Sequence, residues 1–182
     1  MTKAYPDALA NYKKAIQFNS VDGDYAHLQT GIILSIQRKF IESAGELDQV
    51  IKNYPQSRFL DEALYQRAEL DFVQGNYSAS VSGYSKLINT NKSSRFLPYG
   101  YLHRAASYYN LKDYNRTSND YIAIIEKFPA HPLTNDVLLP LQESLNLAGR
   151  SAEFDKYMTQ FKTANPGAKG IEIVEFESAK TL

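Results

Sequence analysis

The sequence predicts an all-α fold, an α–α solenoid of about four helix hairpins that repeat every 37 residues. Two observations carry this prediction. The chain matches itself when it is shifted by one period, and each copy spaces its apolar residues as two amphipathic helices require. Turn-forming residues separate the helices, which makes each copy a hairpin.

The internal match is continuous and has no gap. The segment Ser57-Arg58-Phe59-Leu60 recurs as Ser94-Arg95-Phe96-Leu97, 37 residues later. Small residues hold one repeat position, and aromatic residues hold another nine positions further on. These two sets are Gly31, Ala68 and Ala105, and Phe40, Tyr77 and Tyr114. A small residue lets two helices approach closely, so the register predicts tight hairpins whose seams are buried by stacking.

The elements follow in order along the chain. We expect a lone second helix over residues 5–18, helix pairs over 24–55, 58–92, 95–129 and 133–166, and a linker with a partial next element over 167–182. The pair 58–92 is typical, because Leu64, Ala68 and Phe72 lie four apart before the turn at Gly75.

The fourth pair departs from the pattern. Pro140 falls inside the apolar stretch 134–148, where a proline lacks its N–H and is expected to kink or shorten a helix.

Both ends of the chain suggest a fragment of a longer repeat array. Residues 171–176 alternate like a strand, while 172–182 could equally begin another helix.

Composition narrows the function. The chain has 182 residues, with 20 basic and 20 acidic residues, so no long-range field favours nucleic acid. It has no cysteine, which removes thiol catalysis and thiolate metal sites. Its three histidines are far apart, and we expect no metal or other cofactor. The N-terminal residues do not form a signal peptide, and the longest apolar stretch, around residues 31–36, is too short for a transmembrane segment.

These repeats resemble the tetratricopeptide repeat (TPR). The resemblance rests on the small residue in the first helix, the Gly-Asn-Tyr at 75–77, the small Ser80, the aromatic Tyr84 and the aliphatic Leu87. It covers roughly residues 5–166 and implies a right-handed superhelix. The 37-residue period and Tyr54-Pro55-Gln56-Ser57 also resemble the subgroup in bacterial envelope proteins, such as outer-membrane assembly lipoproteins and Tol-Pal coordinators. That subgroup is the only indication of a periplasmic or envelope location.

The resemblance also implies a binding surface, because the first helix of each repeat usually lines a concave groove that holds a peptide. Carried over by register, the expected groove residues are Tyr25, Leu28, Ile32, Glu62, Tyr65, Glu69, Phe72, Tyr99, Leu102, Ala106 and Tyr109. Tyrosine suits such a surface because it combines a large rigid area with a polar tip. The alternative for each aromatic residue is packing between repeats.

Two arginines, Arg67 and Arg104, recur where the repeat usually has an aliphatic residue. They could donate to a carboxylate or phosphate of a ligand. We favour a structural ion pair with a neighbouring acid. The Lys/Asn set with which some chaperone-binding relatives hold a C-terminal carboxylate is missing from the first helices. His103 has no second histidine or carboxylate at metal spacing and is not expected to bind metal.

The sequence therefore predicts a non-catalytic scaffold that binds a peptide or partner protein in the groove of the first helices. The chain shows no phosphate-binding glycine loop, nucleophile elbow or paired catalytic carboxylates. Two alternatives stay open. One is an RNA-binding helical repeat. The other is a self-assembling solenoid that forms a homodimer through exposed repeat ends.

Overall fold

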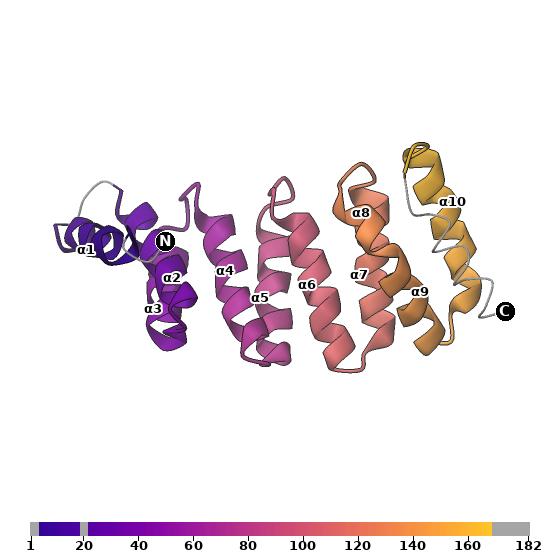
Figure 1. Cartoon of the computed structure of the whole chain (residues 1–182), viewed down its shortest axis with the longest axis horizontal. Helices are drawn as coiled ribbons and strands as arrows, with labels where there is room; N and C mark the ends of the chain where they lie inside the picture. The colour runs from indigo at the N-terminus through magenta and orange to yellow at the C-terminus, as the bar shows by residue number, and fades with distance from the viewer. Residues whose placement is uncertain (1–3, 19–21, 169–182) are drawn as a thin grey trace. The chain divides into compact units, whose positions relative to one another are not determined.

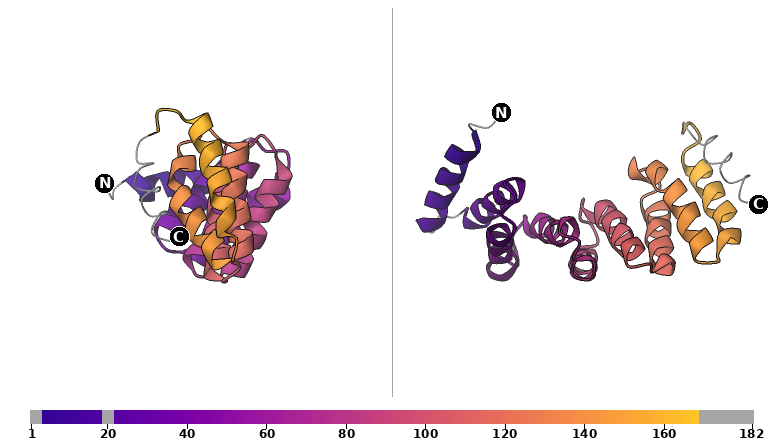
Figure 2. Two further views of the ribbon diagram at one scale, coloured as in Figure 1. Left: turned by 90° about the vertical axis from the view of Figure 1, so that its right-hand side faces the viewer. Right: turned by 60° about the horizontal axis from the view of Figure 1, so that its bottom comes forward.

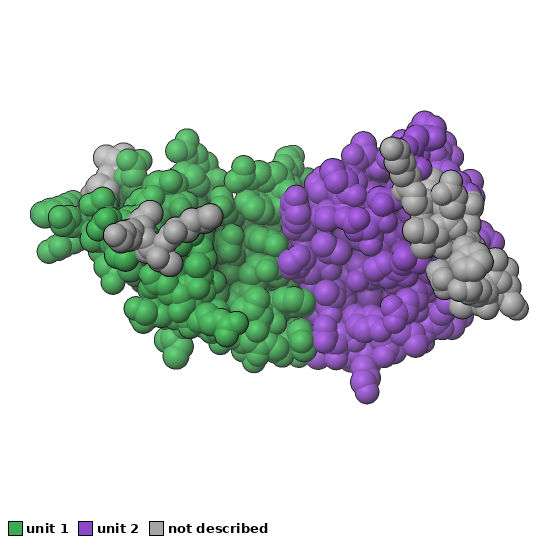
Figure 3. Space-filling view, viewed as in Figure 1, with its two compact units in different colours: residues 1–96 green, residues 97–182 purple. Residues whose placement is uncertain are grey.

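The structure is a computed structural model that describes residues 4–18 and 22–168. The chain divides into two compact units, residues 1–96 and 97–182 (Figure 3). Each unit consists of α-helices packed as consecutive hairpins (Figure 1), which confirms the predicted all-α class. Residues 169–182, for which we expected a strand or a further helix, lie outside the described residues.

Unit 1 begins with a single helix and continues with two hairpins. Its helices are α1 (Ala4–Gln17), α2 (Gly23–Ile36), α3 (Phe40–Asn53), α4 (Leu60–Val73) and α5 (Tyr77–Thr90). Helix α2 pairs with α3 and α4 pairs with α5, while α1 packs on α2 and α3 packs on α4. The paired helices lie side by side in Figure 1 and in the right-hand view of Figure 2.

Unit 2 has one regular hairpin and one irregular hairpin. Its helices are α6 (Leu97–Asn110), α7 (Tyr114–Lys127), α8 (Leu133–Asp136), α9 (Leu138–Leu147) and α10 (Phe154–Ala164), with a short 3-10 turn at Ser151–Glu153. Helix α6 pairs with α7, and α9 packs against both α7 and α10. We call the first helix of a hairpin helix A and the second helix B.

Pro140 shortens a helix as expected. The stretch expected to be one helix is divided at Val137 into α8 and α9, so that Pro140 is the third residue of α9. In a first turn a proline does no harm, because the N–H that it lacks would have no partner within the helix. Because of this break, the first helix of the last hairpin is shorter than the other A helices, and Pro140 fits near its start.

The turn between helix A and helix B has the same geometry in all four hairpins. One residue has a left-handed backbone, with φ between 60° and 77°, and these residues recur every 37 positions as Arg38, Gly75, Lys112 and Gly149. The next residue donates its N–H to a carbonyl five positions back, at 2.8–2.9 Å in every copy. This is the Schellman ending of a helix. Glycine suits the left-handed position, whereas Arg38 and Lys112 carry a Cβ there at an energetic cost.

Small residues bring the two helices of a hairpin together, as the register indicates. A Cβ built on Gly31 would lie 2.8 Å from Leu47 Cγ. Ser43 Oγ donates to the carbonyl of Gly31 at 2.7 Å. Two periods later, Thr117 Oγ1 lies 3.4 Å from the carbonyl oxygen of Ala105, but it donates its proton to the nearer carbonyl of Asp113 at 2.9 Å. In the first of these hairpins, a short hydroxyl side chain on helix B therefore satisfies a carbonyl on helix A where the helices lie close.

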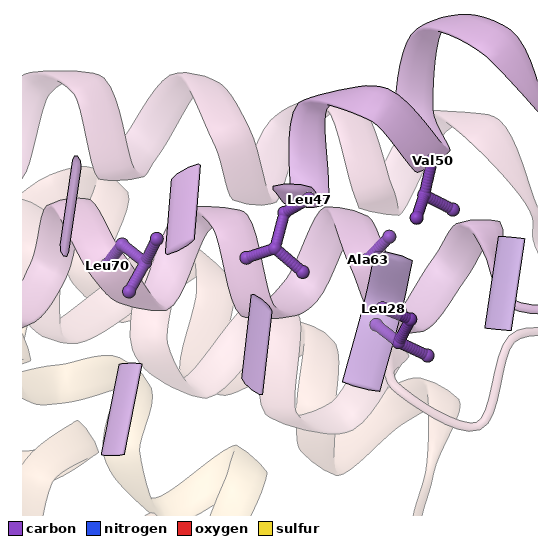
Figure 4. Close-up of a cluster of buried hydrophobic side chains, with 5 residues drawn as sticks. All are labelled: Leu28, Leu47, Val50, Ala63 and Leu70. Atoms are coloured by element: carbon purple, nitrogen blue, oxygen red, sulfur yellow. The ribbon is translucent and has the colours of Figure 1, made fainter. Parts of the chain in front are cut away.

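Apolar side chains fill the space between hairpins. In unit 1, Leu28, Leu47, Val50, Ala63 and Leu70 form one buried cluster, drawn in Figure 4. These residues come from α2, α3 and α4, so the cluster joins the first hairpin to the next. No single hairpin could bury these faces alone, which is the reason that repeat proteins stack.

Candidate functional site

The candidate site is a pocket inside unit 2 between two successive A helices. Its volume is about 240 Å³, and we call it the α6–α9 pocket. Six residues line it: Ala106, Tyr109 and Asn110 from α6, Tyr121 from α7, and Pro140 and Glu143 from α9. The two A helices supply the walls, and a B helix supplies a buried tyrosine behind them.

A hydrogen bond connects the two walls of the pocket. Tyr109 Oη on α6 donates to Glu143 Oε1 on α9 at 2.7 Å. This contact to the carboxylate raises the pKa of Tyr109. Burial, together with the negative charge of Glu143, raises the pKa of Tyr121 to about 12. Both tyrosines therefore keep their protons at neutral pH, and Glu143 supplies the negative charge among the lining residues.

The repeat register explains why an acid stands in the pocket. Glu143 occupies the repeat position of Glu69 in α4, two periods earlier. In unit 1, Tyr84 Oη of the same hairpin donates to the Glu69 carboxylate. The residue equivalent to Tyr84 in the last hairpin is Met158, which has no hydroxyl to donate. Glu143 remains exposed and receives its hydrogen bond from Tyr109 of the preceding hairpin.

Four of the expected groove residues in unit 1 lie partly exposed on its A helices and contact neighbouring side chains. The Tyr25 ring lies 5.1 Å from Phe59, the Tyr65 ring stacks on Phe96 at 5.4 Å, and the Phe72 ring meets Tyr77 at 5.7 Å. Glu62 forms an ion pair with Arg95 at 3.2 Å. These contacts fix the side chains in place and leave part of each accessible.

Other expected residues in unit 1 lie deeper than the register suggested. Leu28 is completely buried in the cluster of Figure 4, so it cannot line an open surface. Ile32 packs against the same cluster, and the carboxylate of Glu69 accepts a hydrogen bond from Tyr84. The correction has a simple cause: the apolar side of a helix in a stacked array packs against the adjacent hairpin.

Unit 2 brings together two of the expected residues, Ala106 and Tyr109, in the α6–α9 pocket. Leu102 is half-buried on α6, and Tyr99 is partly exposed with its ring 5.6 Å from that of His131. Neither of these residues lines the pocket.

Sequence reasoning missed Asn110, Tyr121, Pro140 and Glu143. The repeat register contains a signal for Glu143, because this residue lies 37 residues after Ala106, an expected groove residue. The fourth copy matches the repeat pattern poorly, so the register predicts groove residues in the first three copies alone. In the sequence Pro140 is recognisable only as a helix breaker.

Both recurring arginines form structural ion pairs, as we expected. Arg104 donates from Nε and Nη2 to the two carboxylate oxygens of Asp120, at 2.8 and 2.7 Å, in a largely buried position. Arg67 lies 2.7 Å from Asp71 and 3.5 Å from Asp48. Two parallel bonds to one carboxylate are the strong form of this contact, and both guanidinium groups are used within the fold.

The hairpins define a class of protein: an all-α chain of TPR-like helical repeats. The crystal structure of MamA protein, a TPR protein, matches this chain with a TM-score of 0.68 at 15% sequence identity. The match covers 89% of this chain and 83% of the MamA chain. This likeness establishes the fold.

The sequence comparisons add no further assignment. No protein-family model matches the chain, and no curated protein matches its sequence significantly. The narrower resemblance to bacterial envelope repeats finds no support in these comparisons. Among residues 4–18 and 22–168, no helix is long and apolar enough to cross a membrane, and no group of three or more histidine and acidic side chains is placed to hold a metal ion.

Proposed function

We propose that this chain is a non-catalytic protein-interaction scaffold that binds a peptide segment of a partner protein on the A helices of unit 2. The α6–α9 pocket carries this proposal, because it is a hollow between two successive A helices that already has aromatic and polar side chains in place. The TPR-like fold supports the general role of a protein-interaction scaffold. The use of the A helices follows from the resemblance of the repeats to the TPR.

The pocket is suited to binding without rearrangement. The Tyr109–Glu143 hydrogen bond connects its two walls, and the Tyr109 ring is held 5.5 Å from that of Tyr114. A preformed surface loses little conformational entropy when a ligand binds. The accessible parts of Tyr25, Tyr65 and Phe72 are a separate candidate surface on unit 1.

The test selects peptides and then blocks the pocket. Random dodecapeptides displayed on phage are panned against the immobilised full chain, and the selected peptides are titrated by fluorescence anisotropy. We expect Ala106→Arg to reduce their affinity at least tenfold, because the long side chain enters the pocket. Tyr109→Ala should also weaken binding, by about 1–3 kcal/mol, as expected for an aromatic anchor.

Ala152→Arg is the matched control. Ala152 is exposed in the 3-10 turn at Ser151–Glu153, away from the pocket, and receives the same added charge and bulk. Thermal unfolding of each variant shows whether its fold is retained. The proposal is wrong if no peptide is enriched over blank beads, or if folded Ala106→Arg binds the selected peptides as tightly as Ala152→Arg does.

A further inference from the structure

We propose that the α6–α9 pocket takes the positively charged side chain of an arginine or lysine from the partner peptide. This inference rests on the proposed function and specifies the chemistry of the same site. Three observations support it: the size of the pocket, the hydrogen-bonding groups that line it, and the sign of its charge.

The size favours one side chain over a whole small molecule. The pocket measures about 240 Å³, below the range of about 300–1,000 Å³ usual for small-molecule sites. It is open to solvent along α6 and α9, so a peptide main chain can lie outside while a single long side chain enters. Arginine and lysine have long apolar stems that can pack along Ala106 and Pro140 with the charged end inside.

The polar groups offer acceptors to a donor-rich ligand. Glu143 accepts one hydrogen bond from Tyr109 through Oε1, and a carboxylate has about four acceptor sites. Asn110 uses its Nδ2 to donate to the carbonyl of Ala106 at 2.8 Å, which leaves its Oδ1 as the accepting end of the amide. A guanidinium has five N–H donors and no acceptor, and an ammonium has three. Such groups match this lining.

The negative charge of Glu143 also favours a positively charged ligand group. Glu143 on α9 is exposed at the pocket wall, while the cation Arg104 on the facing helix α6 is held by both oxygens of Asp120. An acidic ligand group would meet the like charge of Glu143. A cation would gain that charge and also the electron-rich rings of Tyr109 and Tyr121, which attract a positive group within about 6 Å of the ring centre.

The experiment replaces the charge on each side of the contact. Peptides selected on the wild-type full chain are examined for a position enriched in arginine or lysine. The best peptide is then synthesised with arginine or with citrulline, its neutral isostere, at that position. We expect citrulline to weaken binding to the wild type about five- to tenfold, in line with a charge-assisted hydrogen bond.

The same pair of peptides is titrated into Glu143→Gln and Glu126→Gln. Glu126 is an exposed acid on α7 outside the pocket lining, so its variant makes the same chemical change elsewhere. The arginine-to-citrulline difference should fall below twofold in Glu143→Gln and remain in Glu126→Gln. Panning on Glu143→Arg should enrich aspartate or glutamate at that position instead.

Each outcome decides between the two proposals. If peptides bind and Ala106→Arg abolishes binding, but no basic position is enriched or the citrulline penalty persists in Glu143→Gln, the scaffold function stands and the cationic pocket is refuted. If no peptide binds, or if blocking the pocket has no effect, the scaffold function fails and the cationic pocket fails with it.

Discussion

Glu69 in unit 1 and Glu143 in unit 2 share a repeat position and differ in their surroundings. Glu69 is half-buried and accepts a hydrogen bond from Tyr84 of its own hairpin. Glu143 is exposed in a pocket, and Met158 at the equivalent position of helix B has no hydroxyl to donate to it. The same repeat position therefore holds an internal contact in unit 1 and an accessible charge in unit 2. Register therefore locates an acid in both units, but it does not fix the partner or the exposure of that acid.

The recurring arginines show the same contrast. Arg104 forms an ion pair with Asp120 of its own hairpin. In the hairpin of Arg67, the repeat position that corresponds to Asp120 holds a glycine, Gly83. Arg67 turns to Asp71 on its own helix and to Asp48 on α3. The glycine has its own role, because a Cβ at Gly83 would lie 2.8 Å from Ala68 Cβ. At this repeat position the two helices of the hairpin pack closely in unit 1, whereas in unit 2 they are joined by a buried ion pair.

The largest expected effect is on that ion pair. Arg104→Met should lower the free energy of unfolding by about 3 kcal/mol or more, because it leaves Asp120 buried without its partner. Arg67→Met should lower it by only about 1 kcal/mol, since Arg67 is about 30% exposed and its carboxylate partners reach solvent. Urea unfolding at neutral pH measures both. Equal losses would show that the two arginines do not differ as their burial indicates.

The Arg104→Met penalty should also depend on pH. Burial already raises the pKa of Asp120 above its ordinary value of 3.8, and Arg104 opposes this rise. Without Arg104 the folded-state pKa rises further, so the folded protein holds a proton that the unfolded chain releases. Stability of the variant then increases as pH falls through that raised pKa. Urea unfolding at about pH 7 and about pH 5 should show a smaller difference from wild type at the lower pH, and a constant difference would contradict this account.

The next effect tests the close contact in unit 1 with one chemical change at two glycines. Gly83→Ala should destabilise the protein by about 1–3 kcal/mol, because its Cβ would also lie 3.2 Å from Ala68 Cα. Gly45→Ala should stabilise it by about 0.5–1 kcal/mol, since Gly45 lies inside α3 with nothing within 4 Å of an added Cβ. Thermal unfolding should therefore shift the two midpoints in opposite directions, and shifts of the same sign would refute the packing argument.

Removing the hydroxyl that satisfies Glu69 has a smaller effect. Tyr84→Phe should destabilise the protein by about 1–2 kcal/mol, because the half-buried carboxylate loses a charge-assisted hydrogen bond. Tyr77→Phe is a suitable control on the same helix α5, where the ring is only half-buried. Urea unfolding of the pair compares them, and a neutral Tyr84→Phe would mean that Glu69 needs no internal partner.

The smallest effect concerns the turns. Lys112→Gly should raise stability by about 0.5–1 kcal/mol, since glycine relieves the left-handed backbone strain at φ 60° but adds freedom to the unfolded chain. Lys112→Ala keeps the Cβ and should bring no such gain. Differential scanning calorimetry of the two variants measures the difference, and an equal gain from alanine would place the effect in the lysine side chain.

The sequence predicts much of the fold because each repeat encodes its own hairpin locally. The small residues at Gly31, Ala68 and Ala105 correctly mark the close helix contacts, and Gly75 and Gly149 mark two of the four turns. The turns at Arg38 and Lys112 carry no such signal, because the repeat geometry imposes a left-handed residue regardless of its type.

The candidate site is less predictable, because it depends on contacts between hairpins. Register selects Tyr109 and Ala106, which line the pocket, and it also selects Leu28, which packing buries completely. The acid in the pocket receives its hydrogen bond from Tyr109 of the preceding hairpin, and a single-helix pattern does not contain that information.

The most direct test of this account locates a bound peptide. Amide chemical shifts of the full chain are recorded while a selected peptide is added. The account predicts that the largest shifts fall on Ala106, Tyr109, Asn110 and Glu143, and that they disappear in Ala106→Arg. Shifts that centre instead on α10 or on the exposed side of α7, and that persist in Ala106→Arg, would contradict the assignment of the α6–α9 pocket as the binding site.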